Sequence, residues 1–127
     1  MKLGDVLFAE SGSMLIAAVS GEIDMSNAER IRDTIVQTTS NQALGLILDL
    51  SSLHYLDSAG IHLVFRLRER LRARGQTLAL VIPAGSASTD AIRLAGVMPH
   101  IDTFESLDEA LCWASGAAAD RVGDRPE

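Results

Sequence analysis

The chain contains a single cysteine, Cys112, and no long uninterrupted apolar run. One thiol cannot form a disulfide within the chain, so the reducing cytoplasm is the expected compartment. The N-terminal residues lack the apolar core of about 7 to 15 residues that defines a signal peptide. Nor is there an uncharged apolar run of about 18 residues that would span a membrane. We therefore expect a cytoplasmic protein that does not bind or cross membranes.

Basic residues are also fewer than acidic residues. The chain carries 11 Lys and Arg residues against 17 Asp and Glu residues, a net charge of −6. Proteins that bind nucleic acids draw much of their affinity from neutralising phosphates, so a general nucleic-acid binder is not expected. With 127 residues, 47% hydrophobic and 22% charged, the composition fits one globular domain whose core requires no metal or disulfide.

Motifs for catalysis, metal binding and phosphate binding are missing. No serine lies in a G-x-S-x-G motif, and the three histidines, His54, His62 and His100, show no triad pattern. With one cysteine, they offer no recognised metal-ligand spacing. Residues 85–89 are small and polar, but no GK[ST] follows them, so they form no P-loop. The sequence therefore predicts neither an enzyme nor a bound metal or cofactor.

Strand-like and helix-like segments alternate along the chain. The first two strands are separated by Ser11-Gly12-Ser13, a short connection suited to an antiparallel hairpin. A nearly continuous apolar run is typical of a strand buried on both faces, which makes Leu44–Leu50 the expected centre of the sheet. The predicted strands are Val6–Glu10, Met14–Ser20, Leu44–Leu50, Thr77–Ile82 and an edge strand at Ile101–Phe104. Such alternation predicts a mainly parallel sheet with right-handed crossovers.

Four helices are expected between and after these strands, and two of them have capping-box signatures. Ser26 with Glu29, and Ser106 with Glu109, have the spacing at which a serine and a glutamate satisfy backbone N–H groups at a helix start. A third helix opens at Ser58 and stops at Gly75. A short fourth helix is expected over residues 88–95, with Gly96 as its C-cap.

The segment that leads into the helix opening at Ser58 is the most informative part of the sequence. We expect residues 51–57 to connect the central strand to the helix that opens at Ser58. In open α/β sheets, functional loops lie outside the carboxyl ends of the strands. Helix starts also favour anions. Ser58 is therefore either only a capping residue or an exposed acceptor for a phosphoryl group, which adds about 1.5 to 2 negative charges at neutral pH.

Three segments together carry a family resemblance. They are Gly21-Glu22-Ile23-Asp24 after a strand, Leu48-Asp49-Leu50, and Leu56-Asp57-Ser58-Ala59-Gly60 at the opening of a helix. In this order and spacing they resemble a STAS domain of the anti-sigma factor antagonist type, over roughly Val6 to Ser115. The resemblance implies an α/β fold, a STAS-like single domain over residues 1–115. Its mixed, mainly parallel sheet has about five strands with about four helices. Residues 116–127 are expected to be a flexible tail.

The resemblance also implies a function. Such proteins bind an anti-sigma factor that is itself a serine kinase with a histidine-kinase-like ATPase fold, and the unphosphorylated form thereby frees the sigma factor. By position, Ser58 matches the phosphorylated serine, Asp57 its preceding aspartate, and Asp24 an aspartate beside the phosphorylation site. A phosphoserine phosphatase reverses the modification. Family members often have a second Ser or Thr after the acceptor, where this chain has Ala59, so Ser58 is the only acceptor in the motif.

Several of these residues have simpler interpretations as well. Asp24 could only form a turn at a strand end, and Asp57 could be a solvated loop charge. On the helix that starts at Ser58, five arginines against Glu69 give a local charge of +4. This side is either a solvated surface or part of the partner surface. The expected partner-binding set is Asp24, Asp57, Ala59, Gly60, Ile61, Phe65 and Arg68, with Arg72 continuing the same side of the helix.

Two other functions compete with the phosphorylation switch. One is a STAS subunit of a lipid-transport or transporter complex that is never phosphorylated. The other is a sensing module that binds a nucleotide or small ligand at helix N-termini. In the leading hypothesis the protein has no direct nucleic-acid or membrane partner, needs no cofactor, and is a monomer or weak dimer.

Overall fold

The computed structural model describes residues 5–86 and 101–122, with side chains described as far as Ser115. Five strands form one sheet in the order β1-β2-β3-β4-β5. The strands are β1 (Asp5–Ser11), β2 (Met14–Ile23), β3 (Gly45–Leu56), β4 (Thr77–Val81) and β5 (Asp102–Phe104). The helices of the described residues are α1 (Ala28–Thr38), α2 (Ser58–Ala73) and α4 (Leu107–Val122). The predicted helix over residues 88–95 and its Gly96 cap lie outside the described residues.

The pairing of the strands agrees with the sequence analysis. Strand β1 pairs antiparallel with β2, and the turn between them contains Gly12 with a φ of 59°, which favours glycine. Strands β2, β3, β4 and β5 pair in parallel. The predicted hairpin, the predicted central strand β3 and the predicted edge strand β5 are therefore confirmed, and the sheet is mixed and mostly parallel.

The prediction that residues 51–57 are a connection is wrong. Strand β3 continues as far as Leu56, and β2 continues as far as Ile23 beside it. The pairing of these two strands shifts register between Ala18 and Ser20 and again between Gly21 and Glu22. Such irregularities break the simple alternation of buried and exposed residues, so the sequence pattern beyond Leu50 resembles a loop although the backbone stays extended.

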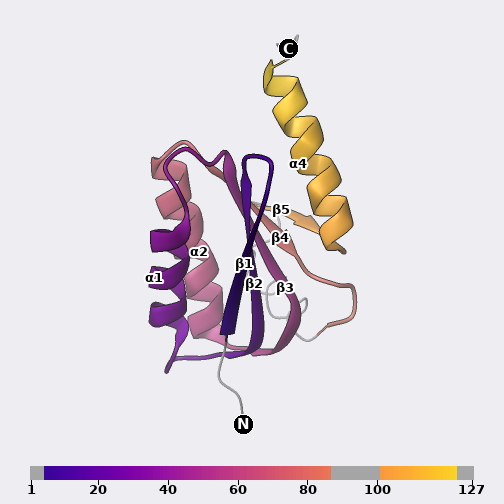
Figure 1. The fold of residues 1–127 in the computed structure, drawn as a ribbon. Helices are drawn as coiled ribbons and strands as arrows, with labels where there is room; N and C mark the ends of the chain where they lie inside the picture. Colours follow the sequence, from indigo (N-terminus) through magenta and orange to yellow (C-terminus); the bar gives the residue numbers. More distant parts are fainter. Residues whose placement is uncertain (1–4, 87–100, 123–127) are drawn as a thin grey trace.

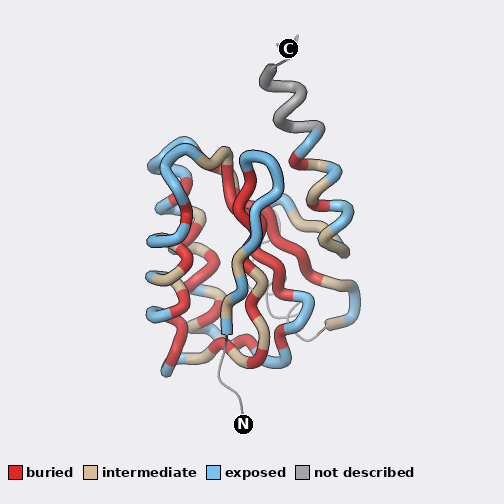
Figure 2. The backbone as a smooth tube through the Cα atoms, viewed as in Figure 1, coloured by how far each residue is buried: buried red, intermediate tan, exposed pale blue. Residues whose placement is uncertain are grey.

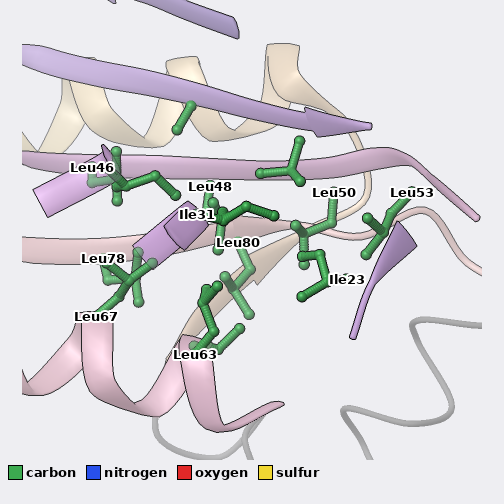
Figure 3. Close-up of a cluster of buried hydrophobic side chains, with 14 of the residues drawn as sticks. Ile23, Ile31, Leu46, Leu48, Leu50, Leu53, Leu63, Leu67, Leu78 and Leu80 are labelled. Carbon is green, nitrogen blue, oxygen red and sulfur yellow. The ribbon is translucent and has the colours of Figure 1, made fainter. Parts of the chain in front are cut away.

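Helices cover the two faces of the sheet. Helices α1 and α2 lie side by side on one face, and α4 lies on the other face near β4 and β5 (Figure 1). Figure 2 shows that strands β2, β3 and β4 are mostly buried between these layers, whereas β1 and the outer sides of the helices are largely exposed. Between the α1–α2 layer and the sheet lies the larger core cluster (Figure 3). It includes Ile23, Ile31, Leu46, Leu48, Leu50, Leu53, Leu63, Leu67, Leu78 and Leu80.

A second core cluster lies beneath α4. Residues that alternate with the first cluster along the strands, such as Ile47 and Val81, contact Ala110 and Ala114 of this helix. Phe104 and Trp113 pack on the same cluster, with ring centroids 5.4 Å apart. The central strands are therefore buried on both faces, as a continuous apolar run predicts.

The two predicted capping boxes have different outcomes. The Ser106 hydroxyl accepts a hydrogen bond from the Glu109 N–H at 3.2 Å, which confirms Ser106 as the residue that caps α4. The first box is wrong, because α1 starts after Asn27, which makes no side-chain capping bond, and the hydroxyl of Ser26 donates to Asp24 instead. The Asp24 carboxylate also accepts the Ser26 N–H at 2.9 Å, the donor that a capping box would give to Glu29.

Helix α4 runs to Val122 and so passes the predicted boundary at Ser115. The division into a domain over residues 1–115 and a tail over residues 116–127 stays a prediction. None of the helices described here is both long enough and apolar enough to cross a membrane.

Candidate functional site

The candidate site lies where β2 and β3 end side by side. Ile23 and Leu56 are the last paired residues of the two strands. Just beyond them, the Asp57 N–H donates a hydrogen bond to the Ile23 carbonyl at 3.4 Å. This contact joins the segment that carries Asp24 to the segment that carries Ser58. The structure therefore brings the two predicted site segments to one edge of the sheet.

Asp57 is the N-cap of helix α2. Its carboxylate oxygen accepts hydrogen bonds from the backbone N–H groups of Ala59 at 2.8 Å and Gly60 at 3.3 Å. These bonds satisfy donors that have no partner inside the helix, and the negative charge lies at the positive end of the helix dipole. The interpretation of Asp57 as a solvated loop charge is therefore wrong.

Ser58 is the first residue of helix α2, and its side chain is exposed. Because Asp57 provides the cap, Ser58 is not needed for it. Within the described residues, the Ser58 hydroxyl has no hydrogen-bond partner. The interpretation of Ser58 as only a capping residue is therefore wrong, and its hydroxyl is accessible beside a helix N-terminus.

Asp24 forms a turn directly after β2. Its carboxylate accepts hydrogen bonds from the Ser26 hydroxyl and from the Ser26 N–H, the latter at 2.9 Å. These two bonds, the hydroxyl first, hold the pKa of Asp24 below its ordinary value. The backbone of Asp24 is fixed by Asn27, whose side-chain oxygen accepts from the Asp24 N–H at 3.0 Å. The turn-forming role is confirmed, and it keeps a charged carboxylate at the same edge as Ser58.

Gly60 allows helix α2 to approach the ends of the strands closely. A Cβ atom at this position would lie 2.5 Å from Cδ1 of Leu56 and 3.2 Å from Cγ2 of Ile23. No side chain fits at those distances without displacement of its neighbours. Gly60 therefore sets the position of the turn that carries Asp57 and Ser58, and it is buried rather than available to a partner.

The predicted partner surface on α2 is only partly exposed. Ile61 and Phe65 are half-buried and pack against the main core cluster, and Arg68 is also half-buried. Their remaining exposed parts follow Ser58 along one side of the helix. Arg72 continues this side and is exposed.

Two exposed apolar side chains near the site did not follow from the sequence pattern. Met25 is 85% exposed in the turn after Asp24, and Tyr55 is 47% exposed near the end of β3. Methionine and tyrosine side chains are enriched at protein interfaces relative to the rest of the surface. An apolar residue inside the polar turn from Asp24 to Ser26 was the signal that could have identified Met25.

Helices α1 and α2 leave a groove between them that begins beside the site. One hollow of about 470 Å³ is lined by Met25 and Ala59 among others. An adjoining hollow of about 580 Å³ shares Arg32, His62 and Arg66 with it and continues along the helices. Among the residues that the structure describes, no cluster of three or more His, Cys, Asp or Glu side chains could hold a metal ion.

The comparison with protein families identifies this arrangement. The model of the STAS domain matches residues 6–110, which is most of the chain. The chain belongs to the STAS-domain family. The match includes both segments that meet at the Ser58 edge of the sheet.

Curated relatives and solved structures agree with the assignment. Anti-sigma-F factor antagonist RsfB of Mycobacterium tuberculosis is 26% identical over 117 residues, which cover 91% of this chain and 93% of RsfB. The crystal structure of an anti-sigma factor antagonist from Mycobacterium paratuberculosis superposes with a TM-score of 0.77 at 24% identity, covering 87% of this chain and 92% of that one. Unphosphorylated SpoIIAA superposes with a TM-score of 0.63 at 20% identity, covering 94% and 99%. This STAS domain thus has the fold of anti-sigma factor antagonists, which are non-enzymatic regulators.

Proposed function

We propose that this STAS domain is an anti-sigma factor antagonist that is switched by phosphorylation of Ser58. The observation that carries the proposal is the division of roles at the start of helix α2. Asp57 caps the helix, and the exposed Ser58 hydroxyl is left without a hydrogen-bond partner among the described residues. The similarity to RsfB, a named anti-sigma-F factor antagonist, over 91% of the chain supports the same function.

The expected partner is an anti-sigma factor that acts as a serine kinase. In the transfer step, the Ser58 oxygen forms a bond to the γ-phosphorus of ATP held by the kinase, and the bond between the β- and γ-phosphates breaks. The serine proton passes to a base on the kinase, and ADP is released. A phosphoserine phosphatase hydrolyses the ester and restores the hydroxyl. The STAS domain supplies only the accessible acceptor.

The sign of the switch follows from the charges at the site. A phosphate on Ser58 gains about 0.3 to 1 kcal/mol from the helix dipole. It also lies next to the carboxylate of Asp57 and near the turn of Asp24. If a partner covers the site, the dianion must lose water, and this desolvation costs several kcal/mol. Because that cost exceeds the gain, phosphorylation is expected to release the partner.

The partner surface combines apolar and basic groups around the serine. Met25 and Tyr55 are exposed on the loop side of Ser58, and Ile61, Phe65 and Arg68 lie partly exposed along helix α2. Apolar side chains with arginine at the centre are enriched in protein interfaces. We expect the unphosphorylated protein to act in the cytoplasm as a monomer or weak dimer and to control transcription only through this partner.

A pull-down from lysate of the native host tests the function, with proteins identified by mass spectrometry. Wild type is compared with Ser58→Asp, which mimics part of the negative charge, and with Ser58→Ala as the uncharged control. The proposal predicts that wild type and Ser58→Ala retain an ATPase-fold serine kinase and that Ser58→Asp loses it. Retention of the same transporter subunits by all three proteins would instead support a structural STAS subunit.

A further inference from the structure

Ser58 and His62 are both exposed and lie one turn apart on helix α2. Residues four apart on a helix are neighbours, with Cβ atoms about 5 to 6 Å apart and about 40° between them around the axis. Helical side chains also lean toward the N-terminus, which directs a side chain at position 62 toward position 58. A phosphoryl group on the Ser58 oxygen therefore comes within reach of the imidazole.

The groove between α1 and α2 opens at this turn. His62 and Arg66 line both of its hollows from the α2 side, and Arg32 lines them from α1. Arg32 already forms an ion pair with Asp33 at 3.0 Å and lies 3.9 Å from a Glu29 carboxylate oxygen. Arg66 forms no ion pair with any residue that the structure describes. The positive charge on the α2 side is thus available to an incoming anion.

We propose that His62, with Arg66 one turn behind it, forms a receiving site for the phosphate on Ser58. Its ligand is a phosphomonoester dianion attached to this chain, so the proposal rests on the proposed function. The phosphate turns toward the α1–α2 groove, away from the side of the helix that carries Ile61 and Phe65. The phosphorylated chain then supplies its own counter-charge and remains stable without a partner.

The other charged groups around His62 do not cancel this arrangement. Arg32 and Glu29 face it from α1, where they are 3.9 Å apart, and Arg66 faces it from α2. The further groove residues Asp33, Glu69 and Arg70 line only the hollow that continues along the helices. The second ionisation of a phosphoserine occurs near pH 6. The contact is therefore expected to be strongest when the phosphate is a dianion.

The test uses full-length protein in which phosphoserine is incorporated at codon 58 during translation, so that no kinase is needed. The midpoint of the second phosphate ionisation is measured by ³¹P NMR between pH 4.5 and pH 8 at low salt. His62→Gln removes the imidazole, His62→Lys places an ammonium group at the same position, and Arg66→Gln removes the second group. Arg72→Gln is the matched control, because it lies on the same side of α2 as Ser58 but about 21 Å along the axis.

A neighbouring cation favours the dianion, so the wild-type midpoint should lie lower than that of His62→Gln by about half a pH unit. His62→Lys should restore the low midpoint, Arg66→Gln should raise it by a smaller amount, and Arg72→Gln should leave it unchanged. Equal midpoints in wild type and His62→Gln would overturn the proposal, as would an equal shift in Arg72→Gln. Because the phosphate is installed without a kinase, either result leaves the proposed function of Ser58 to be decided by partner binding.

Discussion

Asp57 and Ser58 are adjacent in the chain but differ in their hydrogen bonds. The carboxylate of Asp57 accepts two backbone N–H groups of helix α2, and the exposed hydroxyl of Ser58 has no hydrogen-bond partner among the residues that the structure describes. One residue stabilises the helix start, and the next can be modified without loss of the cap. This division allows separate tests of stability and of signalling at neighbouring positions.

Substitution of Asp57 should reveal the cap. Asp57→Ala is expected to lower the free energy of unfolding by about 1 kcal/mol, because two backbone donors lose their acceptor. Asp57→Asn retains an acceptor oxygen and should be close to wild type in stability. Urea denaturation followed by circular dichroism measures both. An Asp57→Ala variant as stable as wild type would contradict the capping role.

Substitution of Gly60 tests the close approach of helix α2 to the sheet. Alanine is the better helix former, yet Gly60→Ala should destabilise the protein by about 1 to 3 kcal/mol, because its Cβ has no room beside Leu56. Ser58→Ala, at an exposed position of the same helical turn, is the control and should stay within about 0.5 kcal/mol of wild type. Stabilisation by Gly60→Ala would show that the helix can move away from the strands.

The stability of the protein should depend on the ionisation of Asp24 at low pH. Hydrogen bonds from Ser26 lower the pKa of Asp24 in the folded state. The stability that they contribute is therefore fully present above the ordinary pKa of an aspartate, about 4, and is lost as the pH falls through the lower folded value. Between pH 5 and pH 2.5, the free energy of unfolding of Asp24→Asn should fall less than that of wild type. Urea denaturation across this range measures the difference, and identical pH profiles would argue against the effect.

The exposed side of α2 offers a test of the partner surface. Arg68→Glu should weaken binding of the anti-sigma factor by about tenfold or more, because it replaces a positive charge beside Phe65 at the proposed interface by a negative one. Arg70→Glu makes the same charge change on the side that faces the α1–α2 groove and should have a much smaller effect. Isothermal titration calorimetry with the purified partner compares the two. Equal losses would indicate a general electrostatic effect rather than a defined surface.

Much of the fold followed from the sequence because the apolar runs are strong and local. The hairpin, the central strand and the edge strand each correspond to a short apolar segment that identifies a strand without reference to the rest of the chain. The end of β3 could not be predicted in this way, since the register shifts beside β2 remove the alternation beyond Leu50. The predicted helix start at Ser26 failed for another reason, because the Asp24 carboxylate accepts both the Ser26 hydroxyl and the Ser26 N–H, the donor that a capping box would give to Glu29.

The candidate site was predictable in position but not in the roles of its residues. The family resemblance singled out Asp24, Asp57 and Ser58, yet the sequence could not decide whether Asp57 or Ser58 caps helix α2. That choice depends on backbone dihedrals: Asp57 is extended, with φ at −107° and ψ at −166°, as N-cap residues typically are. The groove that adjoins the site could not be predicted from the sequence either, because it forms only where α1 and α2 lie side by side.

The central claim is that phosphorylation of Ser58 releases the anti-sigma factor. The most direct measurement is the affinity of the purified partner for two forms of the full chain, unmodified and carrying phosphoserine at position 58, by isothermal titration calorimetry at neutral pH. The account predicts that the phosphorylated form binds at least about 100-fold more weakly, which corresponds to about 2.7 kcal/mol. Equal affinities of the two forms would contradict it.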